Sequence, residues 1–345
     1  MTTDNRLTLI GGVGSPYTRK MVALLRYRGI PYRVIWAQPE ALLPEMGLEI
    51  PKPLLLPTVI MPDENGDMKA ITDSTPIIRR LEAENAGRSV LPTDPALAFI
   101  DYLLEDFGDE WVTKYMFHYR WHFEADADNA GSCLPLNYFM NMPEKEFKQF
   151  KEYITERQVS RLYVVGSNDT TAPIIDASFR RYLKAMEAHL QVQPYLLGNR
   201  PGAGDFANYG QLTQLVGFDP TPRAIVHEVS PRTAVWTTMV EDLSGLEPSD
   251  DDWNNPDEVP ETLRGILNEV GRMYVPALLA NAQAQAAGEK TWEAEIDGAL
   301  WTQQTFPYQT KCLKWLNEEY AALSDEDRAR VDRILAGTGC EALFV

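Results

Sequence analysis

The sequence predicts an α/β domain followed by a long, almost entirely helical region. Short apolar runs alternate with helical patterns in the first part of the chain, and helical periodicity prevails afterwards. A polar segment rich in Pro and Gly separates the two parts. We therefore expect the α/β domain at residues 1–86, a linker at 87–95, an all-helical domain at 96–246, and a helical extension at 247–345 that packs on it.

The α/β domain is expected to run β-α-β, then a loop-rich stretch, then β-β-α. The first two strands would lie parallel, because a right-handed crossover helix connects them. The last two strands flank a turn at Asp63–Asp67 and should form a hairpin. The strands are predicted at 7–10, 31–35, 57–61 and 68–71, and the helices at 16–28 and 74–84.

The rest of the chain shows the spacing of amphipathic helices. An acidic, proline-rich segment at 248–260 indicates a second linker, and further helical patterns run from Glu261 to the end. Because apolar helix faces must be buried, the extension should pack on the preceding domain. Helices before the second linker are expected at 97–123, 144–164, 173–190, 205–215 and 223–243.

Charge and composition exclude several classes of function. The 345 residues include 32 Lys+Arg and 50 Asp+Glu, a net charge of −18, which argues against a broad nucleic-acid surface or an anionic membrane as partner. We expect no membrane span, no signal peptide and a cytoplasmic protein. The three cysteines, Cys133, Cys312 and Cys340, form no disulfide framework and no zinc motif, so no metal is expected.

Three short segments of the α/β domain are candidate binding sites. Ser15 precedes the first helix, Pro57 opens an apolar strand, and Asp73 and Ser74 precede the next helix. The simpler interpretation makes both serines N-caps and Pro57 an ordinary trans proline. The functional interpretation uses the helix starts as anion sites and a cis Leu56–Pro57 bond to turn the Leu56 backbone groups toward a bound peptide. Asp73 would attract an ammonium group.

These segments, in this order, resemble the glutathione transferase family: Ser15-Pro16-Tyr17-Thr18-Arg19-Lys20, Leu56-Pro57-Thr58 and Asp73-Ser74. The resemblance implies a thioredoxin-like N-terminal domain that binds glutathione. It implies that the first segment contacts the thiol, the second the cysteinyl backbone and the third the γ-glutamyl end. Leu196–Gly210 and Val235–Met239 extend the resemblance to about residues 6–245.

The resemblance assigns the hydroxyl that contacts the sulfur to Ser15, with Tyr17 and Thr18 as alternatives. A serine there excludes thiol-transfer chemistry, which needs a nucleophilic thiolate on the protein. Family members often carry a basic residue where Leu55 stands, so the glycyl carboxylate contact would fall to Lys52 or another residue. Gly202 stands where the family usually has Ser or Thr, and Asp205 should complete a structural capping box.

The family resemblance also suggests where an electrophile would bind. The aromatic-rich helix from Leu97 faces the glutathione site in that family, so Tyr115 and Tyr119 are candidates for the electrophile pocket, although such a stripe is often core. The extension is rich in aromatic residues, and some of them are expected to reach and narrow this pocket. The extension contains Trp253, Tyr274, Trp292, Trp301, Phe306, Tyr308, Trp315 and Tyr320.

The expected activity is attack of bound glutathione thiolate on an electrophilic, apolar or aromatic small molecule. The resemblance implies a homodimeric, cytoplasmic detoxification enzyme. The glutathione-binding residues would be Ser15, Tyr17, Lys52, Leu56, Pro57, Thr58, Asp73 and Ser74. Two other interpretations stay open: a glutathione-binding or structural protein without turnover, and an adaptor that binds no glutathione.

Overall fold

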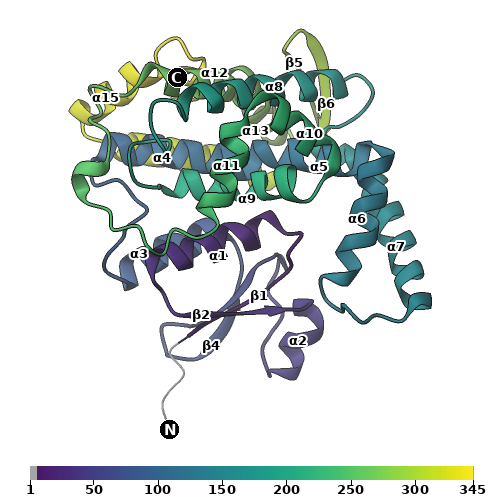
Figure 1. Ribbon diagram of the computed structural model, residues 1–345. Helices are drawn as coiled ribbons and strands as arrows, with labels where there is room; N and C mark the ends of the chain where they lie inside the picture. Colours follow the sequence, from purple (N-terminus) through teal and green to yellow (C-terminus); the bar gives the residue numbers. More distant parts are fainter. Residues whose placement is uncertain (1–5, 345) are drawn as a thin grey trace.

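The computed structural model describes residues 6–344 and begins with a four-stranded sheet of order β2-β1-β3-β4 (Figure 1). Strand β1 (Leu7–Gly11) pairs in parallel with β2 (Tyr32–Trp36) and antiparallel with β3 (Thr58–Pro62). Strand β4 (Met68–Ile71) completes the expected hairpin with β3. The predicted thioredoxin-like α/β domain, followed by a largely helical region, is confirmed.

Helices cover both faces of this sheet. Helices α1 (Pro16–Arg28) and α3 (Ser74–Glu84) lie between the sheet and the helical region, and α2 (Pro39–Glu45) lies on the other side (Figure 1). Ile60 of β3 packs beneath α2 in a small cluster with Leu43. Helix α2 falls in the stretch expected to be a loop, because seven residues that include two prolines give little helical signal.

The helical region starts with one long rod, interrupted by a turn of π helix at Gly108–Val112. The predicted helix at 223–243 is two helices, because Ser230 and Pro231 end one and begin the next. The elements are α4 (Pro95–Phe107), α5 (Thr113–His122), α6 (Glu124–Leu136), α7 (Glu144–Val159), a 3₁₀ turn (Leu162–Val165), α8 (Ala172–His189), α9 (Ala203–Gly217), α10 (Pro220–Val229) and α11 (Pro231–Val240).

The start of α9 explains the glycine at position 202. Asp205 accepts hydrogen bonds from the Gly202 and Leu196 amides, both at 2.9 Å, so its structural role is confirmed. Asp101 of α4 accepts from the next two amides of the helix. A Cβ on Gly202 would lie 2.2 Å from Asp101 Oδ1. A carboxylate from α4 therefore replaces the missing Ser or Thr side chain.

The extension packs against the helical region but is not wholly helical. Helix α12 contacts α8, and α14 and α15 contact α4. A β-hairpin, which the sequence analysis did not predict, places Trp292 and Trp301 in the core. The elements are α12 (Glu261–Glu269), a π turn (Val270–Tyr274), α13 (Val275–Ala286), β5 (Thr291–Ile296), β6 (Ala299–Gln304), α14 (Pro307–Ala322), α15 (Asp325–Leu335) and a 3₁₀ turn (Cys340–Phe344).

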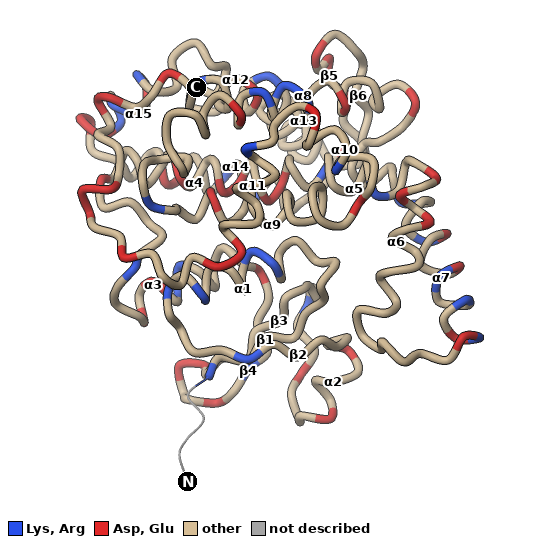
Figure 2. Tube along the Cα trace, in the orientation of Figure 1, with Lys and Arg blue, Asp and Glu red and all other residues tan. Residues whose placement is uncertain are grey.

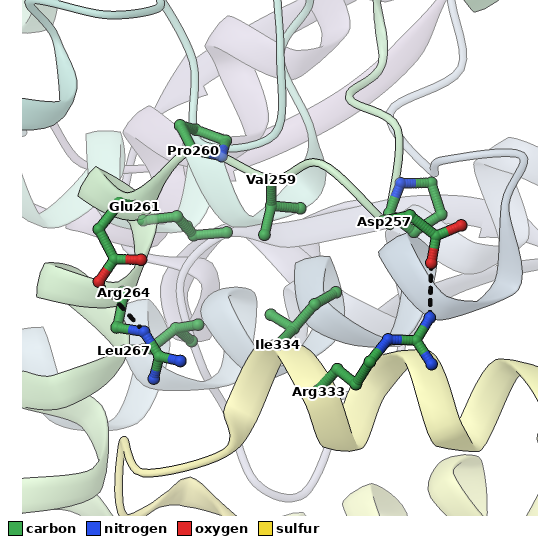
Figure 3. A pocket seen from close by; sticks show the side chains of 10 residues that line it. Asp257, Val259, Pro260, Glu261, Arg264, Leu267, Arg333 and Ile334 are labelled. Atoms are coloured by element: carbon green, nitrogen blue, oxygen red, sulfur yellow. Dashed lines mark hydrogen bonds and ion pairs between the residues drawn. The ribbon is translucent and has the colours of Figure 1, made fainter.

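The second linker is fastened to the helices around it. A 3₁₀ turn at Asp250–Asp252 is followed by Trp253, which is largely buried beneath the Arg200 guanidinium. Further along, the linker borders a cavity of about 220 Å³ between α12 and α15 (Figure 3). Asp257 closes one end of this cavity through an ion pair with Arg333 at 2.5 Å. The contact between Trp253 and Arg200 joins the extension to the preceding helical region, and the pair between Asp257 and Arg333 joins two parts of the extension.

The negative charge is distributed over the whole molecule. Figure 2 shows acidic residues on the N-terminal domain and throughout the helical region. Within residues 6–344, no helix is long and apolar enough to cross a membrane.

Candidate active site

Ser15 forms the N-cap of α1, as the simpler interpretation predicted. Its backbone is extended, and its Oγ accepts a hydrogen bond from the Thr18 amide at 3.2 Å. Pro16 takes the first position of the helix, where its missing N–H costs nothing. The half-buried Ser15 hydroxyl acts here as an acceptor, so its proton stays available for a second partner.

The start of α3 is built differently. Asp73 precedes the helix with φ at +83°, a left-handed value that is uncommon for a residue with a side chain. Its side chain makes no capping bond to the helix. Instead, Asp73 Oδ2 accepts a hydrogen bond from the Tyr308 hydroxyl at 2.7 Å. The first helical residue, Ser74, is buried.

Lys20 connects the start of α3 with α1 and with the helical region. It extends from α1, is fully buried, and donates to Ser74 Oγ at 3.1 Å. It also forms ion pairs with Glu105 at 2.9 Å and Asp109 at 2.6 Å, both on the rod that begins with α4. A buried ammonium needs such partners, because desolvation of an unpaired charge is costly.

The pKa values of this cluster follow from burial and pairing. Burial alone lowers the pKa of Lys20, but Asp109 and Glu105 outweigh it and raise the pKa above its usual value. Burial raises the pKa of Asp109 to about 6, against the opposing effect of Lys20. The pKa of Glu105 is lowered overall, because Lys20 and Arg79 outweigh the effect of burial. Near neutral pH the cluster therefore contains a charged lysine.

The loop before β3 completes this face of the domain. The Leu56–Pro57 peptide bond is cis, and so is Lys52–Pro53, which the sequence analysis did not anticipate. Thr58 is buried, and its hydroxyl donates to the Leu55 carbonyl at 2.9 Å. The Thr72 hydroxyl donates to the Pro53 carbonyl at 3.1 Å, so this loop lies beside the start of α3. Lys52 is exposed, and Leu56 is half-buried just before the strand.

Tyr17 and Thr18, the two alternatives to Ser15, point into packed surroundings. The Tyr17 hydroxyl donates to the Asp109 carbonyl at 2.7 Å. Burial, together with Glu110 and Asp109, raises the pKa of Tyr17 well above its usual value. Thr18 is fully buried, with its hydroxyl near the Gly12 amide. Of the three hydroxyls, that of Ser15 is the best placed for a ligand.

The loop between α6 and α7 covers the segment before Ser15, which the sequence analysis missed. A Cβ on Gly12 would lie 3.2 Å from Tyr138 Oη, and one on Gly14 would lie 2.2 Å from Leu134 Cδ2. At the tip, Phe139 and Met140 are 61% and 81% exposed. The α6–α7 pair projects beside the N-terminal domain (Figure 1). The end of α6 and the start of the loop therefore bring the Leu134 and Tyr138 side chains close to the segment before Ser15.

The aromatic residues Tyr115 and Tyr119 are placed in the core instead of a pocket. Both are fully buried. The Tyr115 hydroxyl lies 2.6 Å from Ser178 Oγ, and the Tyr119 hydroxyl donates to Asp176 at 2.6 Å. Because α5 turns both side chains toward α8, they offer no surface to an electrophile. The structure therefore does not bear out their assignment to a pocket.

Comparison with protein families identifies the domain that carries these features. Residues 9–89 match the model described as "Glutathione S-transferase, N-terminal domain". The N-terminal domain belongs to the glutathione S-transferase family. The match spans Ser15, the cis Leu56–Pro57 bond and the start of α3. A search of curated protein sequences gave no match.

Solved structures with a similar arrangement are distant from this chain. A glutathione S-transferase from Rhodospirillum rubrum is 16% identical, covering 68% of this chain and 87% of its own, with a TM-score of 0.42. One from Methylobacterium radiotolerans, solved with glutathione sulfonate, is 17% identical over 74% and 98%, with a TM-score of 0.38. A Tau class glutathione S-transferase from mango is 16% identical, covering 71% of this chain and 94% of its own, with a TM-score of 0.41. Values this low assign no substrate to this chain.

Within residues 6–344, no group of three or more His, Cys, Asp or Glu side chains has a geometry that could hold a metal ion. Cys133 is exposed on α6, and Cys312 and Cys340 are buried in the extension. No cysteine stands in the segment that precedes α1.

Proposed function

We propose that this protein is a glutathione transferase that joins the glutathione sulfur to an apolar or aromatic electrophile. The observation that carries the proposal is the half-buried Ser15 hydroxyl at the start of α1, within a domain that matches the family model. A helix start and a hydroxyl donor both favour a thiolate over a thiol, which lowers the pKa of the bound thiol.

The tripeptide is proposed to lie across the loop before β3. The backbone of Leu56 and Thr58, on either side of Pro57, would pair with the cysteinyl unit. The γ-glutamyl carboxylate would bind at Ser74 and the start of α3, and its ammonium at Asp73. The exposed Lys52 is the proposed partner of the glycyl carboxylate.

The reaction then needs positioning more than a protein nucleophile. The glutathione thiol gives its proton to solvent, and Ser15 donates a hydrogen bond to the resulting thiolate. The sulfur forms a bond to the electrophilic carbon, and the leaving group departs with its bonding electron pair. We assign the apolar wall of the electrophile site to the end of α6 and the start of the α6–α7 loop, where the Leu134 and Tyr138 side chains lie beside the segment Gly12–Gly14.

Calorimetric titration with glutathione, followed by a conjugation panel of aromatic and alkyl halides, tests this proposal. Ser15→Ala should leave glutathione affinity within a few-fold and lower turnover by more than about tenfold, because a hydrogen bond to a charged group contributes about 1.5–3 kcal/mol. Thr238→Ala, which removes a hydroxyl from α11, is the control. Unchanged turnover and pH profile in Ser15→Ala would move the role to another group.

The alternative is a protein that binds glutathione without turnover. The absence of a basic residue at Leu55 favours it. Glutathione binding with no product on any electrophile would support this alternative, whereas no binding at all would reject both. By resemblance to the family we also propose a cytoplasmic homodimer, and sedimentation equilibrium distinguishes it from the 39.0 kDa monomer.

A further inference from the structure

Asp73 receives a hydrogen bond from a part of the chain outside the matched domain. Tyr308 lies on α14, 235 residues later, and its hydroxyl donates to Asp73 Oδ2 at 2.7 Å. Both side chains are half-buried. Among residues 6–344, no hydrogen bond reaches the other carboxylate oxygen, Oδ1. One oxygen of Asp73 is therefore held, and the other is left for a ligand.

The start of α14 is held in place by contacts other than the one between Tyr308 and Asp73. Asn281 of α13 is fully buried and bonds both backbone groups of Phe306, accepting from its amide at 2.7 Å and donating to its carbonyl at 3.0 Å. Gln309, also buried, donates to Glu110 at 3.2 Å. The Tyr308 ring packs edge-on against Trp315. The hydroxyl is thus held in place independently of Asp73.

A neutral donor suits this position. Burial, together with the nearby Asp73 carboxylate, raises the pKa of Tyr308 well above its usual value, so the phenol keeps its proton near neutral pH. A hydrogen bond from a neutral hydroxyl orients a carboxylate without cancelling its charge. It also stabilises Asp73 in its left-handed backbone conformation, which is unfavourable for a residue with a Cβ.

We propose that Tyr308 is a positioning residue of the γ-glutamyl subsite, holding the Asp73 carboxylate so that its free oxygen receives the α-ammonium of glutathione. This inference rests on the proposed function. It makes the C-terminal extension a working part of the glutathione site. In this proposal Tyr308, one of the aromatic residues of the extension, contributes to the γ-glutamyl end of the site and not to the electrophile pocket.

The test compares Tyr308→Phe with the full-length wild type by calorimetry. The two ligands are glutathione and glutaryl-cysteinyl-glycine, which lacks only the α-amino group. Tyr308→Phe should weaken glutathione binding by about tenfold and change binding of the analogue by less than about twofold. Tyr320→Phe is a matched control on the same helix, since its hydroxyl donates to Asp332 at 2.6 Å far along the chain from the site. It should change neither affinity.

Each other outcome counts against the proposal in a distinct way. Equal losses for both ligands would indicate a merely structural role, and unchanged glutathione binding would remove Tyr308 from the site. Tighter binding would mean that Tyr308 blocks the ammonium position. In an Asp73→Asn background, Tyr308→Phe should have no further effect, which provides a second check. If the wild type binds no glutathione, the proposed function fails together with this inference.

Discussion

The two helix starts of the candidate site look alike in sequence but have different surroundings. Ser15 caps its own helix, and the segment before it is covered by Leu134 and Tyr138 from the α6–α7 pair. Ser74 is buried and accepts a hydrogen bond from Lys20. It follows Asp73, which accepts a hydrogen bond from Tyr308.

This difference separates two tasks within one site. The α3 side is tied to the core through Lys20, Glu105 and Asp109, so we expect it to be rigid and to set ligand recognition. The loop before α1 contacts only side-chain atoms of the α6–α7 pair near Gly12 and Gly14. Because side chains can move without the backbone, this part of the site should tolerate substitutions and different ligands more easily. A rigid end for the part of the ligand that never varies and an adaptable end for variable electrophiles would suit conjugation.

The largest effect should come from removing the Lys20 ammonium group, which bonds the start of α3. Lys20→Met leaves Glu105 and Asp109 buried without their ammonium partner, which should lower the free energy of unfolding by about 3–5 kcal/mol. Urea unfolding followed by circular dichroism measures it. The control is Lys148→Met, which breaks an exposed ion pair with Glu144 and should cost less than about 0.5 kcal/mol. Similar losses in the two variants would contradict the rigid α3 side.

A smaller effect should distinguish two contacts: the packing of α9 against α1, and the packing of the α6–α7 pair against the loop before α1. A Cβ on Gly210 of α9 would lie 2.6 Å from the Pro16 carbonyl oxygen, a backbone atom that moves only with its helix. Gly210→Ala should therefore destabilise the fold by about 2 kcal/mol. Gly14→Ala meets only the side chains of Leu134 and Asn137 and should cost less than about 1 kcal/mol. Thermal unfolding of both variants would test this, and the reverse order would contradict it.

The smallest effect concerns a buried carboxyl between α4 and the extension. Burial raises the pKa of Asp106 to about 7, although a hydrogen bond from Tyr274 at 2.5 Å opposes this shift. Because the folded pKa lies above the unfolded value, the stabilising contribution is complete below about pH 4 and is lost as the pH rises through 7.

Asp106→Asn imitates the protonated acid, so its stability relative to the wild type should be greater by about 1–2 kcal/mol at pH 8.5 than at pH 6. Urea unfolding at both pH values measures this. Asp332→Asn removes another tyrosine-bonded carboxylate at an exposed position and should show no such difference between the two pH values. A constant difference for Asp106→Asn at both pH values would contradict the assignment.

The sequence was sufficient to predict the elements that local signals delimit. Helix α1 begins at Pro16 and ends before Gly29, as its cap residues predict. The β5–β6 hairpin carried a signal too, an Asp297–Gly298 turn between strands that alternate buried and exposed residues, but the sequence analysis predicted helices throughout this part of the chain.

The remaining features depend on contacts that no local pattern encodes. Lys20 lies within the quoted Ser15–Lys20 segment, yet a lysine is ordinarily exposed, so only its buried partners reveal its role. Tyr115 and Tyr119 were expected beside a pocket, but the direction in which α5 faces is decided by α8. The contact between Tyr308 and Asp73 joins residues far apart in the sequence.

That last contact has a consequence for the newly synthesised chain. Asp73 leaves the ribosome early, and Tyr308 follows 235 residues later. At translation rates of about 5–20 residues per second, the two are separated by roughly 10 to 50 s. The N-terminal domain has this time to fold, but Asp73 lacks its hydrogen-bond partner throughout. A nascent or prematurely terminated chain would thus carry the N-terminal domain without the hydrogen bond to Asp73, and under our proposal it would bind glutathione more weakly than the finished chain.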